Sequence, residues 1–178
     1  MLKLGTNSIS SIYLGSTKIA KAYLGSSLVY QKKGVEPVVD YSREYLTLTA
    51  LGNSVTFSIV ANEPDPNISL VSYSTDGGST WNTMSPEPTA TNIATLNSGQ
   101  SVLLKGKCTN NVSTAYIKID GTGDYSASGN IMSLAFEDDF INKFDISYKY
   151  AIFSYLFYQS AHLVDAEHLL LPATTLAS

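Results

Sequence analysis

The sequence predicts a mainly β protein with a short N-terminal β-meander, an immunoglobulin-like β-sandwich and a small α/β region at the C-terminus. Three observations lead to this fold class. The first thirty residues repeat with a period of ten, and the middle of the chain carries short alternating segments at roughly ten-residue spacing. The chain of 178 residues also contains 24 Ser and 16 Thr, which suit strands and turns better than helix interiors.

The N-terminal repeat predicts short strands joined by tight turns. A Leu-Gly pair recurs at 4–5, 14–15 and 24–25, each time followed by Ser or Thr, and glycine accepts the positive φ that such turns need. We expect a meander of three or four strands within a module of residues 1–33, which is too small to bury a core alone. It is therefore expected to lie against a partner, symmetry mates or the next domain, the alternative being an ordinary edge sheet of that domain. The residues expected at this interface are Ile9, Tyr13, Ile19, Tyr23 and Val29.

The middle of the chain predicts a linker over 34–40 and an immunoglobulin-like β-sandwich over 41–125. Alternation of apolar and polar residues, together with short apolar runs, predicts strands at 44–50, 55–59, 68–74, 101–106 and 114–120. The Cys…Trp…Cys pattern of antibody domains is absent, so only the architecture is predicted. The residues predicted to form the core are Phe57, Ile59, Tyr73, Leu104 and Ile117.

One motif predicts a structural hairpin. The segment 74–81, STDGGSTW, matches the S-x-D-x-G-x-T-W pattern of the Asp box, which in sialidases recurs once per propeller blade, away from the catalytic centre. We expect Asp76 to accept hydrogen bonds from turn amides, Gly78 to supply an unusual φ, and Trp81 to pack under the turn. A glycosidase is the alternative that this motif raises, but the box occurs once in a chain too short for a propeller.

Composition and charge argue against several classes of partner. The formal net charge is −4, and no basic cluster exceeds Lys32–Lys33, so no nucleic-acid partner is expected. No apolar run reaches the length that spans a bilayer, so no membrane insertion is expected. The N-terminus lacks the apolar segment of a secretory signal peptide, which predicts a protein made in a cytoplasm. The single Cys108 excludes an internal disulfide and is expected to be a buried small residue.

No constellation of side chains predicts catalysis, and we expect neither an enzyme nor a cofactor. The only histidines, His162 and His168, have a spacing that does not suit metal ligands on one helix or strand face, so they are expected on the surface. Asp120 and Asp124 are expected in a β-turn, and the acidic residues 137–139 at a solvated helix end. No catalytic, cofactor-binding or metal-binding residue is therefore predicted.

The pattern changes after residue 131, and the predicted small α/β region covers 126–178. Two groups of apolar residues fall at helical spacing. They are Met132, Ala135 and Phe136, and then Ile152, Phe153, Leu156 and Phe157.

Two resemblances to known families follow from the motifs at the ends of the chain. The segment IYLGSTKIAKAYLGSSLVY, with its neighbours over 1–31, resembles the short N-terminal repeats of virion proteins of phages that infect gut Bacteroidales, including the crAss-like group. The segment 163–178, ending in LPATTLAS, resembles the start of the BspA-like leucine-rich repeats in surface proteins of gut Bacteroidales and their phages. Residues 126–134 resemble the cap before such arrays. The family's repeated cysteines are missing here, and only one repeat is present, whereas solenoids need about three.

These resemblances imply a structural virion protein, located in the virion and acting as a head or tail fibre or decoration protein. In the first family the N-terminal part attaches the protein to the particle, which implies capsid or tail proteins as partners. Likeness to phage fibres implies a homotrimer. The repeat region implies a recognition role towards a host-surface glycan or protein. A bacterial surface adhesin or glycan-binding module is the alternative, although an adhesin would need an export signal.

Overall fold

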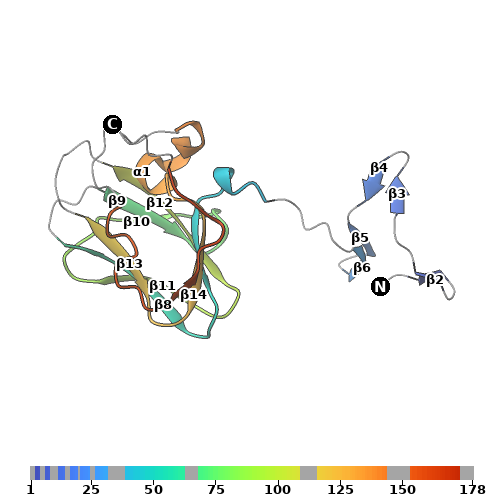
Figure 1. Ribbon diagram of the computed structural model, residues 1–178, viewed down its shortest axis with the longest axis horizontal. Helices are drawn as coiled ribbons and strands as arrows, with labels where there is room; N and C mark the ends of the chain where they lie inside the picture. Colours follow the sequence, from blue (N-terminus) through green and yellow to red (C-terminus); the bar gives the residue numbers. More distant parts are fainter. Residues whose placement is uncertain are drawn as a thin grey trace. The chain divides into compact units, whose positions relative to one another are not determined.

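The computed structural model describes residues 39–62, 68–108, 116–143 and 153–172 in full, together with the backbone of six short strands between Lys3 and Gln31. The chain divides into two compact units, Met1–Val39 and Asp40–Ser178. The protein is mainly β, as the sequence predicts (Figure 1). The two units are described separately below.

The described strands of the N-terminal unit form three β-hairpins, one for each ten-residue repeat. The antiparallel pairs are β1 (Lys3–Leu4) with β2 (Asn7–Ser8), β3 (Ile12–Leu14) with β4 (Thr17–Ile19), and β5 (Lys21–Leu24) with β6 (Ser27–Gln31). In each hairpin the two residues between the strands are the Gly-Thr or Gly-Ser of the repeat. The described strands form three separate sheets, which corrects the expected single meander. The reason is that each repeat supplies both strands of its own hairpin.

The C-terminal unit contains two β-sheets. Its elements are η1 (Tyr41–Arg43), β7 (Leu46–Ala50), β8 (Val55–Ala61), β9 (Ile68–Ser74), β10 (Asn82–Met84), β11 (Thr91–Leu96), β12 (Ser101–Cys108), β13 (Ile117–Gly121), β14 (Tyr125–Asn130), α1 (Ser133–Phe136), η2 (Glu137–Asn142), β15 (Leu163–Asp165) and β16 (Leu169–Leu170). The larger sheet has the order β10-β9-β12-β7-β14-β15, with β16 also paired to β14, and the smaller has the order β11-β8-β13. All pairs are antiparallel except β14 with β15 and β16.

The two sheets share one hydrophobic core, which contains buried residues from both. Every second residue of β7, β8 and β13 is buried, which is the pattern of strands with one face on a core. Phe57 on β8 meets Tyr125 on β14 edge to face at a centroid distance of 5.2 Å, so the rings join the sheets. Four of the five predicted core residues are fully buried: Phe57, Ile59, Leu104 and Ile117. The fifth, Tyr73, is only half-buried because it lies beside the edge strand β10.

The residues after 125 belong to the same compact unit as the sheets before them. The predicted boundary between 125 and 126 falls inside β14, which pairs along its length with β7 and is therefore a strand of the larger sheet. The helix α1 packs against β12. Residues 126–134, whose sequence resembles the cap of a leucine-rich repeat array, therefore lie mostly in β14.

The segment 153–170 runs along β13 and β14. The Leu156 carbonyl accepts a hydrogen bond from the Ile119 N–H of β13 (2.7 Å), and β15 and β16 pair with β14. The helical spacing noted here does not produce a helix in 153–159, which is a series of turns, and Ile152 lies outside the described residues. Successive turns closed by hydrogen bonds from residue i+3 to residue i space apolar side chains much as a helix does. Leu156, on these turns, is buried in the core.

Candidate functional site

The Asp-box segment 74–81 connects β9 and β10 as a hairpin. The Asp76 carboxylate accepts hydrogen bonds from the Thr80 N–H (2.9 Å), the Thr80 hydroxyl (2.7 Å) and the Ser74 hydroxyl (2.7 Å). The Ser74 oxygen in turn accepts the Gly78 N–H at 2.9 Å. Gly77 and Gly78 have φ values of 71° and 89°, which other residues rarely adopt. The turn is thus closed by its own side chains.

This hydrogen bonding makes Asp76 a structural carboxylate. The bonds from the Thr80 backbone, the Thr80 hydroxyl and Ser74 favour the ionised form and lower the pKa of Asp76 from 3.8 to about 2. A general acid or base needs a pKa near the working pH. Asp76 is therefore ionised at neutral pH and does not have the titration range of such a group.

Trp81 joins a cluster of side chains that the sequence does not reveal. The Lys105 ammonium lies 4.3 Å from the centroid of the Trp81 ring and 2.8 Å from the Asp138 carboxylate. The Tyr45 hydroxyl donates a hydrogen bond to the same carboxylate at 2.7 Å, and the Tyr45 ring meets Trp81 edge to face at 5.1 Å. Burial raises the pKa of Tyr45 to about 12, with the bond to Asp138 and its charge adding to the effect. The cluster holds the hairpin, β12 and η2 together.

Residues 137–139 are exposed at the start of η2, as expected of a solvated helix end, and Asp138 in addition contacts distant residues. Its partners come from 33 and 93 residues away in the sequence, which is why local patterns could not identify them. The hydrogen bonds from Lys105 and Tyr45 lower the pKa of Asp138, and the carboxylate acts as the acceptor that ties η2 to the larger sheet. The third carboxylate, Asp139, pairs with Lys143 at 3.1 Å on the surface.

The two histidines, Asp120 and Asp124 do not belong to the cluster around Asp138. His162 Nδ1 lies 3.3 Å from Asp124 Oδ1, and His168 stacks on the Tyr41 ring at 4.5 Å. Asp120 accepts a hydrogen bond from the Ser160 hydroxyl at 2.9 Å, and the buried Tyr125 hydroxyl lies 2.7 Å from that Ser160 oxygen. Burial opposes ionisation of Asp120, but the bonds from Ser160, Lys118 and Gly121 outweigh it and lower the pKa. This network tethers the C-terminal segment to β13 and β14.

Within the described residues, no group of three or more His, Cys, Asp or Glu side chains could hold a metal ion. No helix in the same part of the chain has the length and apolar character needed to cross a bilayer. Cys108 is half-buried and packs against the core, so it is less enclosed than the sequence suggests. The absence of enzymatic activity stays a prediction.

The predicted attachment residues lie in the N-terminal unit. Tyr13, Ile19, Tyr23 and Val29 are on β3, β4, β5 and β6, respectively, and their side chains lie outside what the structure describes. Ile9 lies outside the described residues altogether. Their expected burial against partners therefore stays a prediction.

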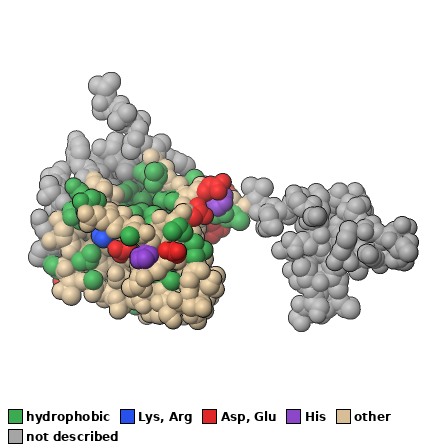
Figure 2. Space-filling model, turned by 60° about the horizontal axis from the view of Figure 1, so that its bottom comes forward, with side chains coloured by type: hydrophobic (Ala, Val, Ile, Leu, Met, Phe, Trp, Pro, Cys, Tyr) green, Lys and Arg blue, Asp and Glu red, His purple; other side chains and the backbone are tan. Residues whose placement is uncertain are grey.

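The C-terminal edge of the larger sheet exposes apolar side chains. The strands β15 and β16 pair in parallel with β14, and Val164, Leu170 and Leu171 nearby are 57%, 38% and 70% exposed. Residues 173–177, which are most of the LPATTLA motif, lie outside the described residues. In the space-filling view, hydrophobic side chains reach the surface close to acidic and histidine side chains (Figure 2).

Comparison with protein-family models, with curated proteins and with solved structures found no match to the chain. Any functional conclusion therefore rests on the sequence and on the geometry described above.

Proposed function

We propose that this protein is a structural component of a phage virion, a head or tail fibre or decoration protein anchored by residues 1–33. The observation that carries the proposal is that the described strands of the N-terminal unit form three separate hairpins, one for each ten-residue repeat. A two-stranded hairpin is marginally stable in water by itself. Three in tandem therefore favour a segment that becomes stable against a partner, and the resemblance of the repeats supports a particle protein as that partner.

The same argument supports self-association. Every described strand of the N-terminal unit pairs on one side only, so among the described residues the other side of each strand has no pairing partner. Open edges pair readily with another chain. Identical chains that associate commonly form closed symmetric oligomers. The likeness to phage fibres favours a homotrimer over a dimer.

For the C-terminal unit, we propose an immunoglobulin-like sandwich. Strand β8 pairs with β11 in one sheet, while β9 pairs with β12 in the other, which corresponds to the B–E and C–F pairs of that fold. The pairing of the first and last strands, β7 and β13, differs from that of the immunoglobulin fold. β7 pairs with β12 and β13 pairs with β8, the reverse of the arrangement expected for the first and last strands.

The C-terminal edge is proposed to begin a leucine-rich repeat that presents a recognition region to a host-surface glycan or protein. Parallel pairing of β15 and β16 with β14 supports this, because solenoid repeats stack strands in parallel. The exposed apolar side chains Val164 and Leu171 fit an edge that a further repeat would cover.

Mass spectrometry of particles purified from the phage that encodes the chain tests the proposal. The expected result is that the protein co-purifies with the major capsid protein through a density gradient at a fixed ratio. A chain that is plentiful in the lysate and absent from the particles contradicts the proposal. Recovery from a bacterial envelope fraction instead supports the adhesin alternative.

A further inference from the structure

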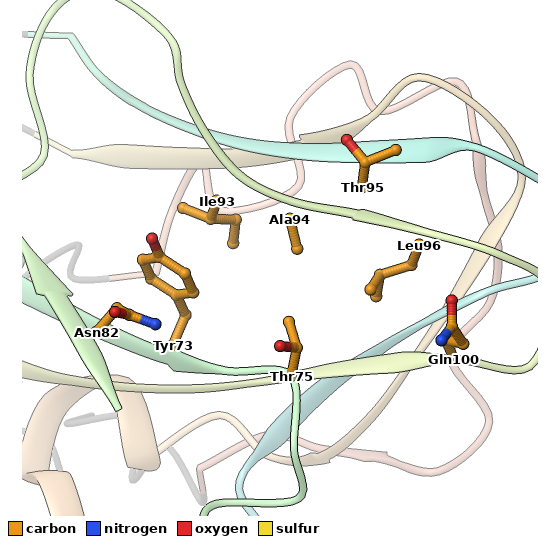
Figure 3. A pocket seen from close by; sticks show the side chains of 8 residues that line it. All are labelled: Tyr73, Thr75, Asn82, Ile93, Ala94, Thr95, Leu96 and Gln100. Atoms are coloured by element: carbon orange, nitrogen blue, oxygen red, sulfur yellow. The ribbon is translucent and has the colours of Figure 1, made fainter. Parts of the chain in front are cut away.

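The two lateral sides of the sandwich differ. On the β13 side, the segment 153–160 covers the gap between the sheets and inserts Leu156, which is 2% exposed. On the opposite side, the edge strands β10 and β11 leave a groove with a volume of about 490 Å³ between the sheets (Figure 3). This volume falls within the range of about 300–1,000 Å³ that is typical of small-molecule sites.

The shape of the groove comes from both edge strands. Figure 3 shows Tyr73 and Thr75 extending from the larger sheet towards Ile93 and Leu96 on the smaller one. The pairing of β11 with β8 shifts between Asn92 and Ala94, so Ile93 is an extra residue without a partner opposite it. Such bulges re-aim side chains at sheet edges, and Ile93 and Leu96 are only 7% and 6% exposed at this groove.

The groove is lined without any charged side chain. Its polar groups are hydroxyls and amides, and Asn82 lies directly opposite Tyr73 across the β9–β10 pair. Within the described part of the chain, the Tyr73 hydroxyl, the Thr75 hydroxyl and the Asn82 amide make no hydrogen bond to protein. The Gln100 amide oxygen accepts the Asn97 N–H at 2.8 Å, which leaves its NH₂ group for another partner. The free groups therefore include both donors and acceptors.

We propose that this groove binds a neutral saccharide. A sugar ring has an apolar face that can lie on the half-buried Tyr73 ring, and its hydroxyl groups are donors and acceptors that match the Asn82 and Gln100 amides. Both amides are exposed, and an apolar ligand that covered them would displace their water and offer no hydrogen bond in return, which is unfavourable. A charged ligand would find no opposite charge in the lining. The inference does not rest on the proposed virion role, because binding is a property of the isolated chain.

Saturation-transfer NMR on the full chain tests this proposal. The probes are glucose, galactose, mannose, N-acetylglucosamine, lactose and maltose. We expect saturation transfer to at least one of these sugars. Asn82→Ala should weaken its binding by up to about tenfold, because the sugar would lose a hydrogen bond to this exposed amide. Tyr73→Phe keeps the ring and removes only the hydroxyl, so a smaller loss is expected.

Asn92→Ala is the matched control. Asn92 is another exposed asparagine on an edge strand, one residue from Ile93, and it does not line the groove. This variant should bind as the wild type does. The proposal is overturned if none of the six sugars shows saturation transfer, or if Asn82→Ala and Asn92→Ala have the same affinity as each other.

Discussion

At the scale of single residues, Ser133 illustrates how one buried hydroxyl completes a sheet. The pairing of β7 with β12 ends at Leu46 and Leu104. At this last pair, the Ser133 hydroxyl oxygen accepts the Leu46 N–H at 3.0 Å and the hydroxyl donates to the Leu104 carbonyl at 2.9 Å. Ser133 is completely buried, so water cannot replace it. The hydroxyl therefore bridges the two strands where α1 crosses them.

Ser133→Ala should lower the free energy of unfolding by about 1–3 kcal/mol, because it leaves a buried N–H and a buried carbonyl without a partner. Urea denaturation followed by tryptophan fluorescence measures this change. Ser128→Ala is the control, since Ser128 is only half-buried on β14, and it should change stability by less than about 0.5 kcal/mol. Equal effects from the two variants would show that the bridge contributes nothing.

At the scale of elements, the hairpin 74–81 has a defined pH dependence. Asp76 has a pKa of about 2 in the folded chain against 3.8 for the unperturbed group. A lowered pKa contributes stability that is present above the unfolded value and is lost as pH falls through the folded value. The stabilisation from Asp76 is therefore complete at neutral pH and disappears between about pH 4 and pH 2.

Asp76→Asn should consequently destabilise the protein at neutral pH, and the difference from the wild type should shrink as pH falls below about 4. Denaturation midpoints measured across this pH range give the comparison, and Glu87→Gln, at an exposed residue outside the turn, serves as the control. A stability difference that stays constant down to pH 2 would contradict the assigned role of the carboxylate.

The C-terminal segment is a second element whose role can be measured. Leu156 is 2% exposed and contacts the core, whereas Tyr158, two residues later, is 51% exposed. Leu156→Ala should lower the free energy of unfolding by about 2–5 kcal/mol through the cavity that it leaves. Tyr158→Ala removes an exposed ring and its edge-to-face contact with Tyr155, so it should cost less than about 1.5 kcal/mol. If Leu156→Ala is as mild as Tyr158→Ala, the segment 153–160 is not part of the folded unit.

The sequence predicts those strands best whose apolar residues alternate or cluster. β7, β8, β9, β12 and β13 were all expected close to their observed positions, because aliphatic residues fill their buried faces. β14 has the sequence YSASGN, and its small inward residues Ala127 and Gly129 give little apolar signal. In β11, the extra residue Ile93 breaks the period of two. Both strands were therefore missed.

The candidate sites likewise divide into one that the local sequence predicts and two that it does not. The hairpin around Asp76 was predictable because its hydrogen bonds join residues within six positions of one another. The cluster of Lys105, Tyr45 and Asp138 depends on contacts between distant parts of the chain. The groove at β10 and β11 likewise depends on which edge of the sandwich remains uncovered, a property of topology that local patterns do not contain.

At the scale of the whole molecule, we expect a homotrimer. Association as such is favoured because each described N-terminal strand pairs on one side only and the C-terminal edge exposes Val164 and Leu171, and the number three comes from the likeness to phage fibres. Light scattering on the purified chain at micromolar concentration measures the state directly, and the mass should be about three times that of one chain. A strict monomer would contradict the trimer and weaken the fibre proposal.

Incorporation into particles is the measurement that tests the proposed attachment role most directly. Phage particles are assembled with the full chain, with a chain lacking residues 1–31, or with Leu171→Ser as a control on the exposed C-terminal edge. Quantitative mass spectrometry of the purified particles should find the full chain and the control at equal occupancy and the truncated chain absent. Thermal unfolding should confirm that the truncated chain keeps a folded C-terminal unit. A truncated chain that enters particles at full occupancy would contradict the proposal.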